Sequence, residues 1–118
     1  MSHLEVLAAS VARDVEARLA AQLTGFAGAM VRAYLPQRWV FVTEKETVSL
    51  TVGKDGKVAA AAGPVPEPDV TIETSHARLT AAFATRDRSK VPPGPLTVTP
   101  HTAKGRTAFE FLRGRIGL

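Results

Sequence analysis

The side chains best suited to catalysis or metal binding are few and scattered in this 118-residue chain. Its three histidines, His3, His76 and His101, stand far apart. None of them belongs to an H-x-x-x-H pair that would place two imidazoles on one helix face, and no carboxylate cluster accompanies them. The absence of cysteine excludes disulfides, thiolate metal sites and cysteine nucleophiles. We therefore expect no metal and no cofactor.

Two short motifs resemble catalytic machinery without its surroundings. Ser75 and His76 could act as nucleophile and base, but neighbours in a helix point in different directions, and no G-x-S-x-G elbow surrounds the serine. We interpret Ser75 as a helix N-cap followed by an exposed imidazole. The segment 53–57 (GKDGK) is too short for a Walker A loop and joins two strands, whereas a phosphate loop leads into a helix. Catalysis is not expected.

The charge is basic and unevenly placed. The chain carries 15 Lys+Arg against 11 Asp+Glu, and residues 76–118 hold eight of these cations but only Asp87 and Glu110 as acids. Such a segment attracts nucleic acid or anionic lipid, or simply forms a solvated face. No predicted strand displays the exposed aromatic pair that stacks bases, so we expect no nucleic-acid partner.

The elements that position these residues begin with helices. Ser2 and Glu5 form a capping-box pattern, and apolar residues then recur at helical spacing as far as Leu23. A second helical stretch is predicted from Phe26 to Leu35, where Pro36 ends it. Nothing indicates a second domain, so we predict one domain over 1–118, with N-terminal helices in 1–35 and a sheet with a C-terminal helix in 36–118.

Five strands are predicted after residue 36. They cover 38–42, 47–52, 57–62, 69–74 and 96–99, with one helix after Ser75 and another from about Thr102. Short connections favour antiparallel neighbours. The fold class is therefore α+β, with a five-stranded, mostly antiparallel sheet covered on one face by helices. The other face is expected to be wet, with these residues outward: Thr47, Ser49, Thr51, Asp69, Thr71, Glu73, Thr97 and Thr99.

The inward apolar residues suggest a binding site. In the last helix Phe109 lies off the face formed by Ala108, Phe111 and Leu112, and Gly105 and Gly114 predict a loose attachment. A mobile apolar helix over a sheet would form a lid over an apolar ligand. The residues expected to converge between sheet and helices, and to line this site, are Trp39, Phe41, Leu50, Val52, Leu79, Phe83, Phe109, Phe111, Leu112 and Ile116.

The order of elements resembles the sterol carrier protein type 2 (SCP2) domain. The similarity is carried by the Trp-Val-Phe-Val strand at 39–42, the Gly-Lys-Asp-Gly turn at 53–56, a strand ending in Gly-Pro at 63–64, the segment 68–75 and the terminal amphipathic helix. It implies an apolar tunnel that takes sterols, fatty acyl chains or isoprenoids, in a lipid carrier or an accessory factor of quinone biosynthesis. The basic, rigid segment 86–95 departs from the family, which usually has a small apolar helix there.

We accordingly expect a non-catalytic lipid-binding protein. Arg86, Arg88, Lys90, Arg113 and Arg115 are predicted to face an anionic head group or membrane surface, and transient membrane contact and a homodimer are further expectations. No apolar run approaches the roughly 18 residues of a membrane span, no secretory signal is visible and the chain lacks a peroxisomal address, which predicts a cytoplasmic protein. The alternatives are an interaction module with a filled core, dimerising through the C-terminal helix, and, less favoured, a basic nucleic-acid-binding domain.

Overall fold

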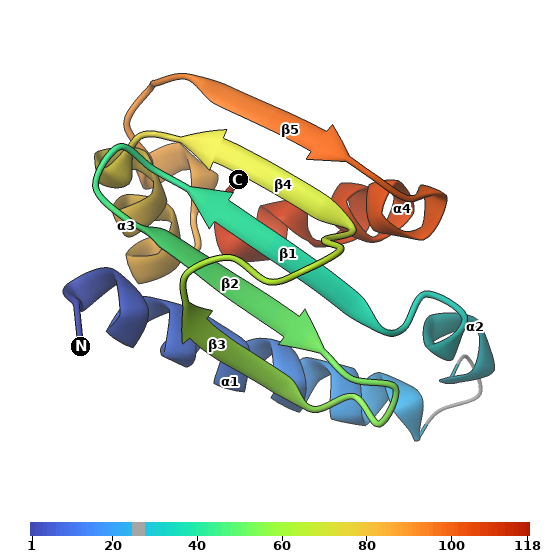
Figure 1. Ribbon diagram of the computed structural model, residues 1–118. Coiled ribbons are helices and arrows are strands. Elements are labelled where there is room, and N and C mark those ends of the chain that lie inside the picture. The colour runs from blue at the N-terminus through green and yellow to red at the C-terminus, as the bar shows by residue number, and fades with distance from the viewer. Residues whose placement is uncertain (25–27) are drawn as a thin grey trace.

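The structure is a computed structural model that describes residues 1–24 and 28–118 (Figure 1). Its elements follow the predicted order of two helices, four strands, a helix, a strand and a helix. They are α1 (His3–Leu23), α2 (Gly28–Arg32), β1 (Gln37–Val42), β2 (Thr47–Val52), β3 (Val58–Ala62), β4 (Val70–Thr74), α3 (His76–Thr85), the 3-10 turn η1 (Arg88–Lys90), β5 (Leu96–Pro100), α4 (Ala103–Leu112) and the 3-10 turn η2 (Arg113–Ile116). The expected start of the second helix, Phe26, lies outside the described residues.

The five strands form one mixed sheet in the order β3-β2-β1-β4-β5. Three neighbouring pairs are antiparallel, and β1 and β4 run parallel at the centre. The α+β class and the mostly antiparallel sheet are thus confirmed. The register sets Trp39 opposite Leu50 on β2 and Val70 on β4, so these side chains share the inner face.

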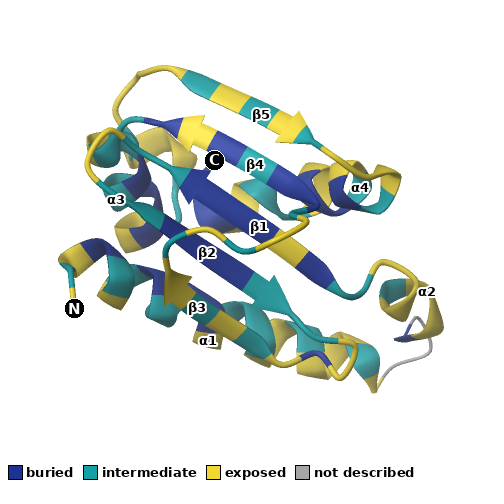
Figure 2. Ribbon diagram, viewed as in Figure 1, coloured by how far each residue is buried: buried dark blue, intermediate teal, exposed yellow. Residues whose placement is uncertain are grey.

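Helices cover one face of the sheet, and the packing between helices and sheet differs at the two ends of the strands. Figure 1 shows α1, α3 and α4 behind the sheet and α2 beyond the end at which β1 begins. The α3 end is tightly packed, because Phe83 of α3 meets Phe41 of β1 edge-on, with ring centroids 5.2 Å apart. Both rings are fully buried. Figure 2 shows buried residues on the three inner strands β1, β2 and β4, whereas the edge strands β3 and β5 alternate between intermediate and exposed residues.

Two residues expected on the outer face of the sheet are less exposed to solvent than the sequence predicts. Ser49 is 1% exposed and Asp69 is 5% exposed, although both were expected to face water. The connector from Gly63 to Asp69 crosses this face in front of β2 and β1 (Figure 1), and the Ser49 hydroxyl donates to the Gly63 carbonyl oxygen over 2.5 Å. Val40 of β1 is also buried, at 4% exposed.

The predicted caps and turn are confirmed. The side chains of Ser2, Ser75 and Thr102 each accept a hydrogen bond from the backbone N–H three residues on, at 3.0–3.1 Å. In the β2–β3 hairpin Gly56 takes a positive φ of 83°, which a residue with a side chain rarely adopts. No helix in the described part of the chain is long and apolar enough to cross a membrane.

The last helix differs from the predicted loose lid. Gly105 lies so close to β4 that an added Cβ would be 2.5 Å from the Asp69 carbonyl oxygen, so this glycine allows tight packing. The C-terminal turn is also anchored, because Leu118 is fully buried. The turn ends at Gly117, which has a φ of 84°. Both ends of this segment are therefore attached to the body of the protein.

Candidate ligand-binding site

A cavity of about 500 Å³ lies between the inner face of the sheet and the helices, at the α2 end of the molecule. Its volume falls within the range of about 300–1,000 Å³ typical of sites for small molecules and cofactors. The wall is mostly apolar and is drawn from α1, α2 and the turn after it, β1, β2, β3, α4 and η2. Its residues are Val15, Arg18, Leu19, Gln22, Met30, Val31, Tyr34, Leu35, Gln37, Trp39, Leu50, Val52, Val58, Thr107, Ala108, Phe111, Leu112, Arg115 and Ile116.

The floor of the cavity comes from alternate positions of neighbouring strands. Trp39 and Leu50 face each other across β1 and β2, and Val52 follows two residues later on the same face of β2. Above them, α1 packs on β2 and β3, whereas α4 packs on β4 and β5. The cavity lies between these two helices, over β1 and β2.

The polar groups in the floor are paired with one another. The indole N–H of Trp39 donates to Gln37 Oε1 over 2.9 Å, and Gln37 Nε2 donates to the Tyr34 carbonyl oxygen over 2.6 Å. Gln37 is only 3% exposed, so an unpaired amide there would be costly. This chain of bonds leaves the floor apolar toward the cavity.

The cavity reaches solvent at a border that we call the cavity rim, formed by Arg18, Met30, Tyr34, Phe111 and Arg115. Met30 is 72% exposed and Phe111 is 77% exposed, although both also line the cavity. Tyr34 is exposed to 38%, and both arginines are exposed. The cavity rim therefore combines large apolar side chains with two cations.

Of the ten apolar residues predicted to line a site, the structure brings six to this cavity. They are Trp39, Leu50, Val52, Phe111, Leu112 and Ile116. Phe41, Leu79 and Phe83 do not line it, because they are fully buried where α3 packs on the sheet. These three side chains point inward, as predicted, but the contact between α3 and the sheet encloses them.

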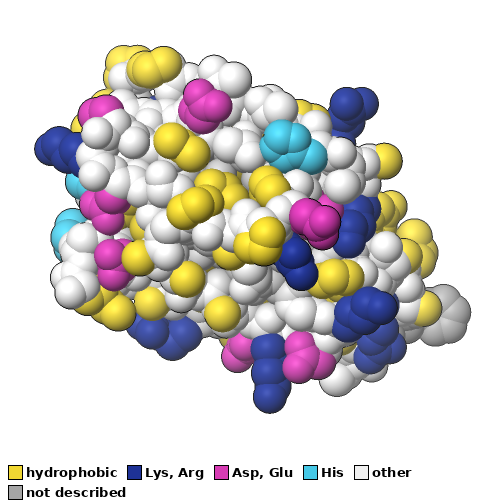
Figure 3. All heavy atoms as spheres, viewed as in Figure 1, with side chains coloured by type: hydrophobic (Ala, Val, Ile, Leu, Met, Phe, Trp, Pro, Cys, Tyr) yellow, Lys and Arg dark blue, Asp and Glu magenta, His cyan; other side chains and the backbone are white. Residues whose placement is uncertain are grey.

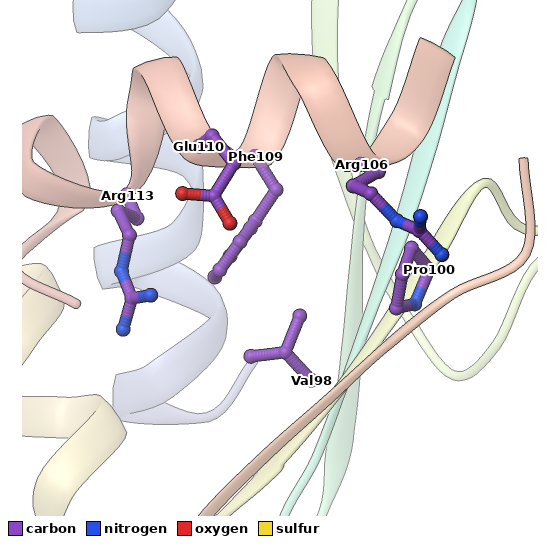
Figure 4. A pocket seen from close by; sticks show the side chains of 6 residues that line it. All are labelled: Val98, Pro100, Arg106, Phe109, Glu110 and Arg113. Atoms are coloured by element: carbon purple, nitrogen blue, oxygen red, sulfur yellow. The ribbon is translucent and has the colours of Figure 1, made fainter. Parts of the chain in front are cut away.

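The two phenylalanines of the last helix lie in different environments. Phe109 is 3% exposed and packs on Trp39, with ring centroids 5.4 Å apart, whereas Phe111 faces outward at the cavity rim. Phe109 also lines a smaller pocket of about 170 Å³ between α4 and β5. Figure 4 shows Phe109 pointing from α4 into the space above Val98, with Arg113 at one end of the pocket and Arg106 beside Pro100 at the other.

Of the five basic residues predicted at the mouth, Arg115 alone lines the cavity. Arg86 pairs with Asp14 of α1 and donates to Ser10, and Arg113 lies over the Phe109 ring at 5.3 Å. Arg88 and Lys90 lie in η1, which follows α3. Clustering in sequence therefore did not predict clustering at the mouth.

The sequence interpretation missed the contribution of the N-terminal helices. Val15 and Leu19 of α1 and Met30, Val31 and Leu35 around α2 line the cavity. The signal was present, because Val15 and Leu19 stand four residues apart in the apolar stripe of α1, which was interpreted as ordinary packing. Arg18 lies on the same stretch and completes the cavity rim.

His76 does not line this cavity, and its contacts are with Glu46 and its neighbours. Its Nε2 lies 2.9 Å from Glu46 Oε2, and the Ser2 hydroxyl donates to Glu46 Oε1 over 2.5 Å. These two contacts, Ser2 first, hold the pKa of Glu46 below its ordinary value of 4.5. The imidazole is partly buried, not fully exposed as predicted. In residues 1–24 and 28–118 no group of three or more His, Asp or Glu side chains could hold a metal ion.

Comparison with known proteins finds similarity at the level of structure alone. No family model matches the chain, and no curated protein matches it. Among solved structures, the chain is similar to a protein described as "UbiJ-SCP2 Ubiquinone synthesis protein", with 15% sequence identity and a TM-score of 0.48 over 91% of this chain and 89% of that one. That description includes the SCP2 name, but a match at this level does not assign the chain to a family.

Proposed function

We propose that this protein binds a lipid or a similarly apolar molecule, non-covalently, in the 500 Å³ cavity. The observation that carries the proposal is the cavity itself, an apolar space over Trp39 and Leu50 that the side chains of the fold leave open. Protein interiors are otherwise packed as densely as organic crystals. A space of this size with an apolar wall fits an acyl, isoprenoid or sterol-like ligand.

Removal of apolar surface from water would drive binding. The gain is roughly 25 cal/mol per Å² of apolar surface buried, before the cost of ordering the ligand is subtracted. The internal pairing of Trp39 with Gln37 favours this mode, because the floor presents no unpaired polar group to an apolar ligand. Orientation would come from the polar groups near the border, Arg18, Gln22, Thr107 and Arg115.

The polar side chains of the cavity wall favour ligand binding over catalysis. Two arginines, two glutamines, one threonine and Tyr34 supply its polar side chains, and none of the described residues that line it is a His, Asp or Glu. Ser75 and His76, the pair that most resembled a catalytic motif, contribute to capping α3 and to the Glu46 contact. We therefore propose a binding protein and not an enzyme.

The structure gives little support to the alternative of a dimer formed through the C-terminal helix. Phe109 and Ile116, two of the large apolar residues of this segment, are buried against the body of the same chain. Phe111 is left as the large exposed apolar side chain of α4. One such residue is a small fraction of the roughly 800 Å² per partner that a stable interface buries.

The first test uses the single tryptophan of the chain, which lies in the cavity floor. Cis-parinaric acid, a polyene fatty acid that absorbs where tryptophan emits, should quench Trp39 emission at one equivalent. Native mass spectrometry of freshly purified protein, followed by organic extraction, would identify any copurified lipid. An unchanged Trp39 spectrum at saturating probe would contradict the proposal.

Variants locate the binding. Ala108→Phe places a ring in the cavity wall and should abolish probe quenching, whereas Ala103→Phe, at an exposed position of the same helix, should leave it intact. Because the first change overfills a packed site, Val52→Phe on β2 provides a second, half-buried blocking position. Equal quenching by all three variants would show that the probe binds elsewhere.

A further inference from the structure

The cavity rim gathers exposed apolar side chains to an unusual degree. Five large hydrophobic residues are exposed in the described chain, and Met30, Tyr34 and Phe111 of the cavity rim are three of them. They come from the segment around α2 and from α4, which are far apart in sequence and line the same cavity. Apolar residues grouped in this way, with polar residues around them, mark an interaction surface.

The charge around this opening is positive. Arg18 and Arg115 line the cavity, and neither makes an ion pair within the described residues. The β2–β3 hairpin adds Lys54 and Lys57, since an added Cβ at Gly56 in the same turn would meet the Leu23 side chain at the end of α1. Figure 3 shows a group of Lys and Arg side chains in this region, between the hairpin and α2.

Two carboxylates near this end accept hydrogen bonds from backbone N–H groups. Asp55 of the hairpin accepts from the Lys57 backbone N–H over 3.1 Å, and Glu16 of α1 accepts from the Val58 backbone N–H over 2.8 Å. Neither lines the cavity. An approaching partner would therefore meet apolar side chains flanked by cations.

We propose that the cavity rim docks on an anionic lipid bilayer. Met30, Tyr34 and Phe111 would enter the headgroup region, while Arg18 and Arg115 would contact anionic headgroups, as at other interfacial sites that combine apolar and basic residues. The cavity would then open toward the membrane, so an apolar ligand could enter or leave without crossing water. This inference rests on the proposed function, for which it names the source of the ligand.

A second copy of the chain is a poorer occupant. A two-fold dimer through this surface would bring Arg18 and Arg115 of one copy against the same cations of its partner. Like charges facing one another across an interface oppose association. An anionic membrane satisfies both features of the surface, its apolar side chains and its charge.

The test is flotation of the purified protein with phosphatidylcholine vesicles, with and without phosphatidylglycerol. We expect binding to the anionic vesicles that weakens as salt is added. The double variant R18Q/R115Q should reduce partitioning about 25-fold, since each basic residue near an anionic surface contributes about fivefold. The matched control R88Q/K90Q removes the same charge from η1, after α3, and should change partitioning less than about twofold. Phe111→Ser should weaken binding without altering thermal stability, because the side chain is exposed.

The outcomes separate the inference from the function on which it rests. Equal losses in both charge variants would overturn the inference, because net charge and not the cavity rim would then control binding. Absence of vesicle binding would also overturn it, and concentration-dependent dimers sensitive to Phe111→Ser would identify a second copy as the occupant. Trp39 quenching by parinaric acid in vesicle-free buffer reports on the cavity alone. Quenching without flotation would leave the proposed function standing and remove the docking surface.

Discussion

The two phenylalanines of α4 give the sharpest test of the structure, because they are chemically identical and two residues apart. Phe109 is 3% exposed and packs on Trp39, whereas Phe111 is 77% exposed at the cavity rim. We predict that Phe109→Ala destabilises the protein strongly and that Phe111→Ala scarcely changes its stability. The paired variants remove the same atoms from the same helix, so the difference reports burial.

The expected magnitudes follow from these environments. Truncating a buried phenylalanine costs about 3–5 kcal/mol, and the aromatic contact with Trp39 places Phe109 in the middle of that range or above. Truncating an exposed side chain changes the free energy of unfolding by less than about 0.5 kcal/mol. For 118 residues, an unfolding entropy of about 2.1 cal/mol/K per residue converts a loss of about 4 kcal/mol to a Tm about 16 °C lower.

The assay is urea unfolding followed by Trp39 fluorescence, with circular dichroism as a second probe that does not depend on the Phe109–Trp39 contact. Coincident transitions would justify a two-state free energy for each variant. Comparable losses of stability for Phe109→Ala and Phe111→Ala would refute the assigned rotation of α4 and, with it, the place of Phe111 at the cavity rim.

Three further changes test other contacts of the fold. Gly105→Ala should cost about 1–3 kcal/mol in urea unfolding, because its Cβ would meet the Asp69 backbone at 2.5 Å, while Gly114→Ala, which meets nothing within 4 Å, should be neutral or stabilising. Gln37→Leu should cost about 1–3 kcal/mol, because it leaves the Trp39 N–H unpaired. The control Gln22→Leu, at an exposed position of the same cavity wall, should not destabilise the protein. Equal effects of the two changes in urea unfolding would argue against the Gln37–Trp39 bond. The lowered pKa of Glu46 means that its contribution to stability is present above pH 4.5 and is lost as pH falls through the lower folded pKa. Tm measured against pH should therefore fall less in the acid range for Glu46→Gln than for the wild type, with Glu73→Gln at an exposed position of β4 as the control.

Local structure could be predicted from the sequence because its causes are local. Ser2, Ser75 and Thr102 cap helices through bonds that span three residues, and Gly56 provides the positive φ of a hairpin turn. Alternation of apolar and polar residues likewise predicted the strands at 47–52 and 69–74. None of these features depends on a distant part of the chain.

The division between core and cavity could not be predicted in this way. Phe41 and Trp39 are both aromatic, lie on the same face of β1 and are two residues apart. Phe83 of α3 fills the space before Phe41, whereas the cavity lies before Trp39, so the distinction depends on where separate helices pack. Ser49 and Asp69 are similar cases, because distant segments bury them: Ser49 donates to Gly63 of the connector, whereas Asp69 packs against the start of α4. The rotation of α4 also depends on a tertiary contact, the close approach of Gly105 to Asp69.

These tertiary contacts explain why a cavity persists between α1 and α4. Asp69 fixes α4, since its side chain accepts from Thr102 Oγ1 over 2.8 Å and from the Arg38 backbone N–H over 2.9 Å, while Gly105 packs against its backbone. Near the other edge of the same face, α1 is held by the hydrogen bond that Glu16 accepts from the Val58 backbone N–H. Each helix is attached near a different edge of the sheet through hydrogen bonds that would be lost if it moved inward. Closing the cavity by sliding the helices together would leave buried polar groups unpaired, so filling it with an apolar ligand is the less costly way to cover Trp39 and Leu50.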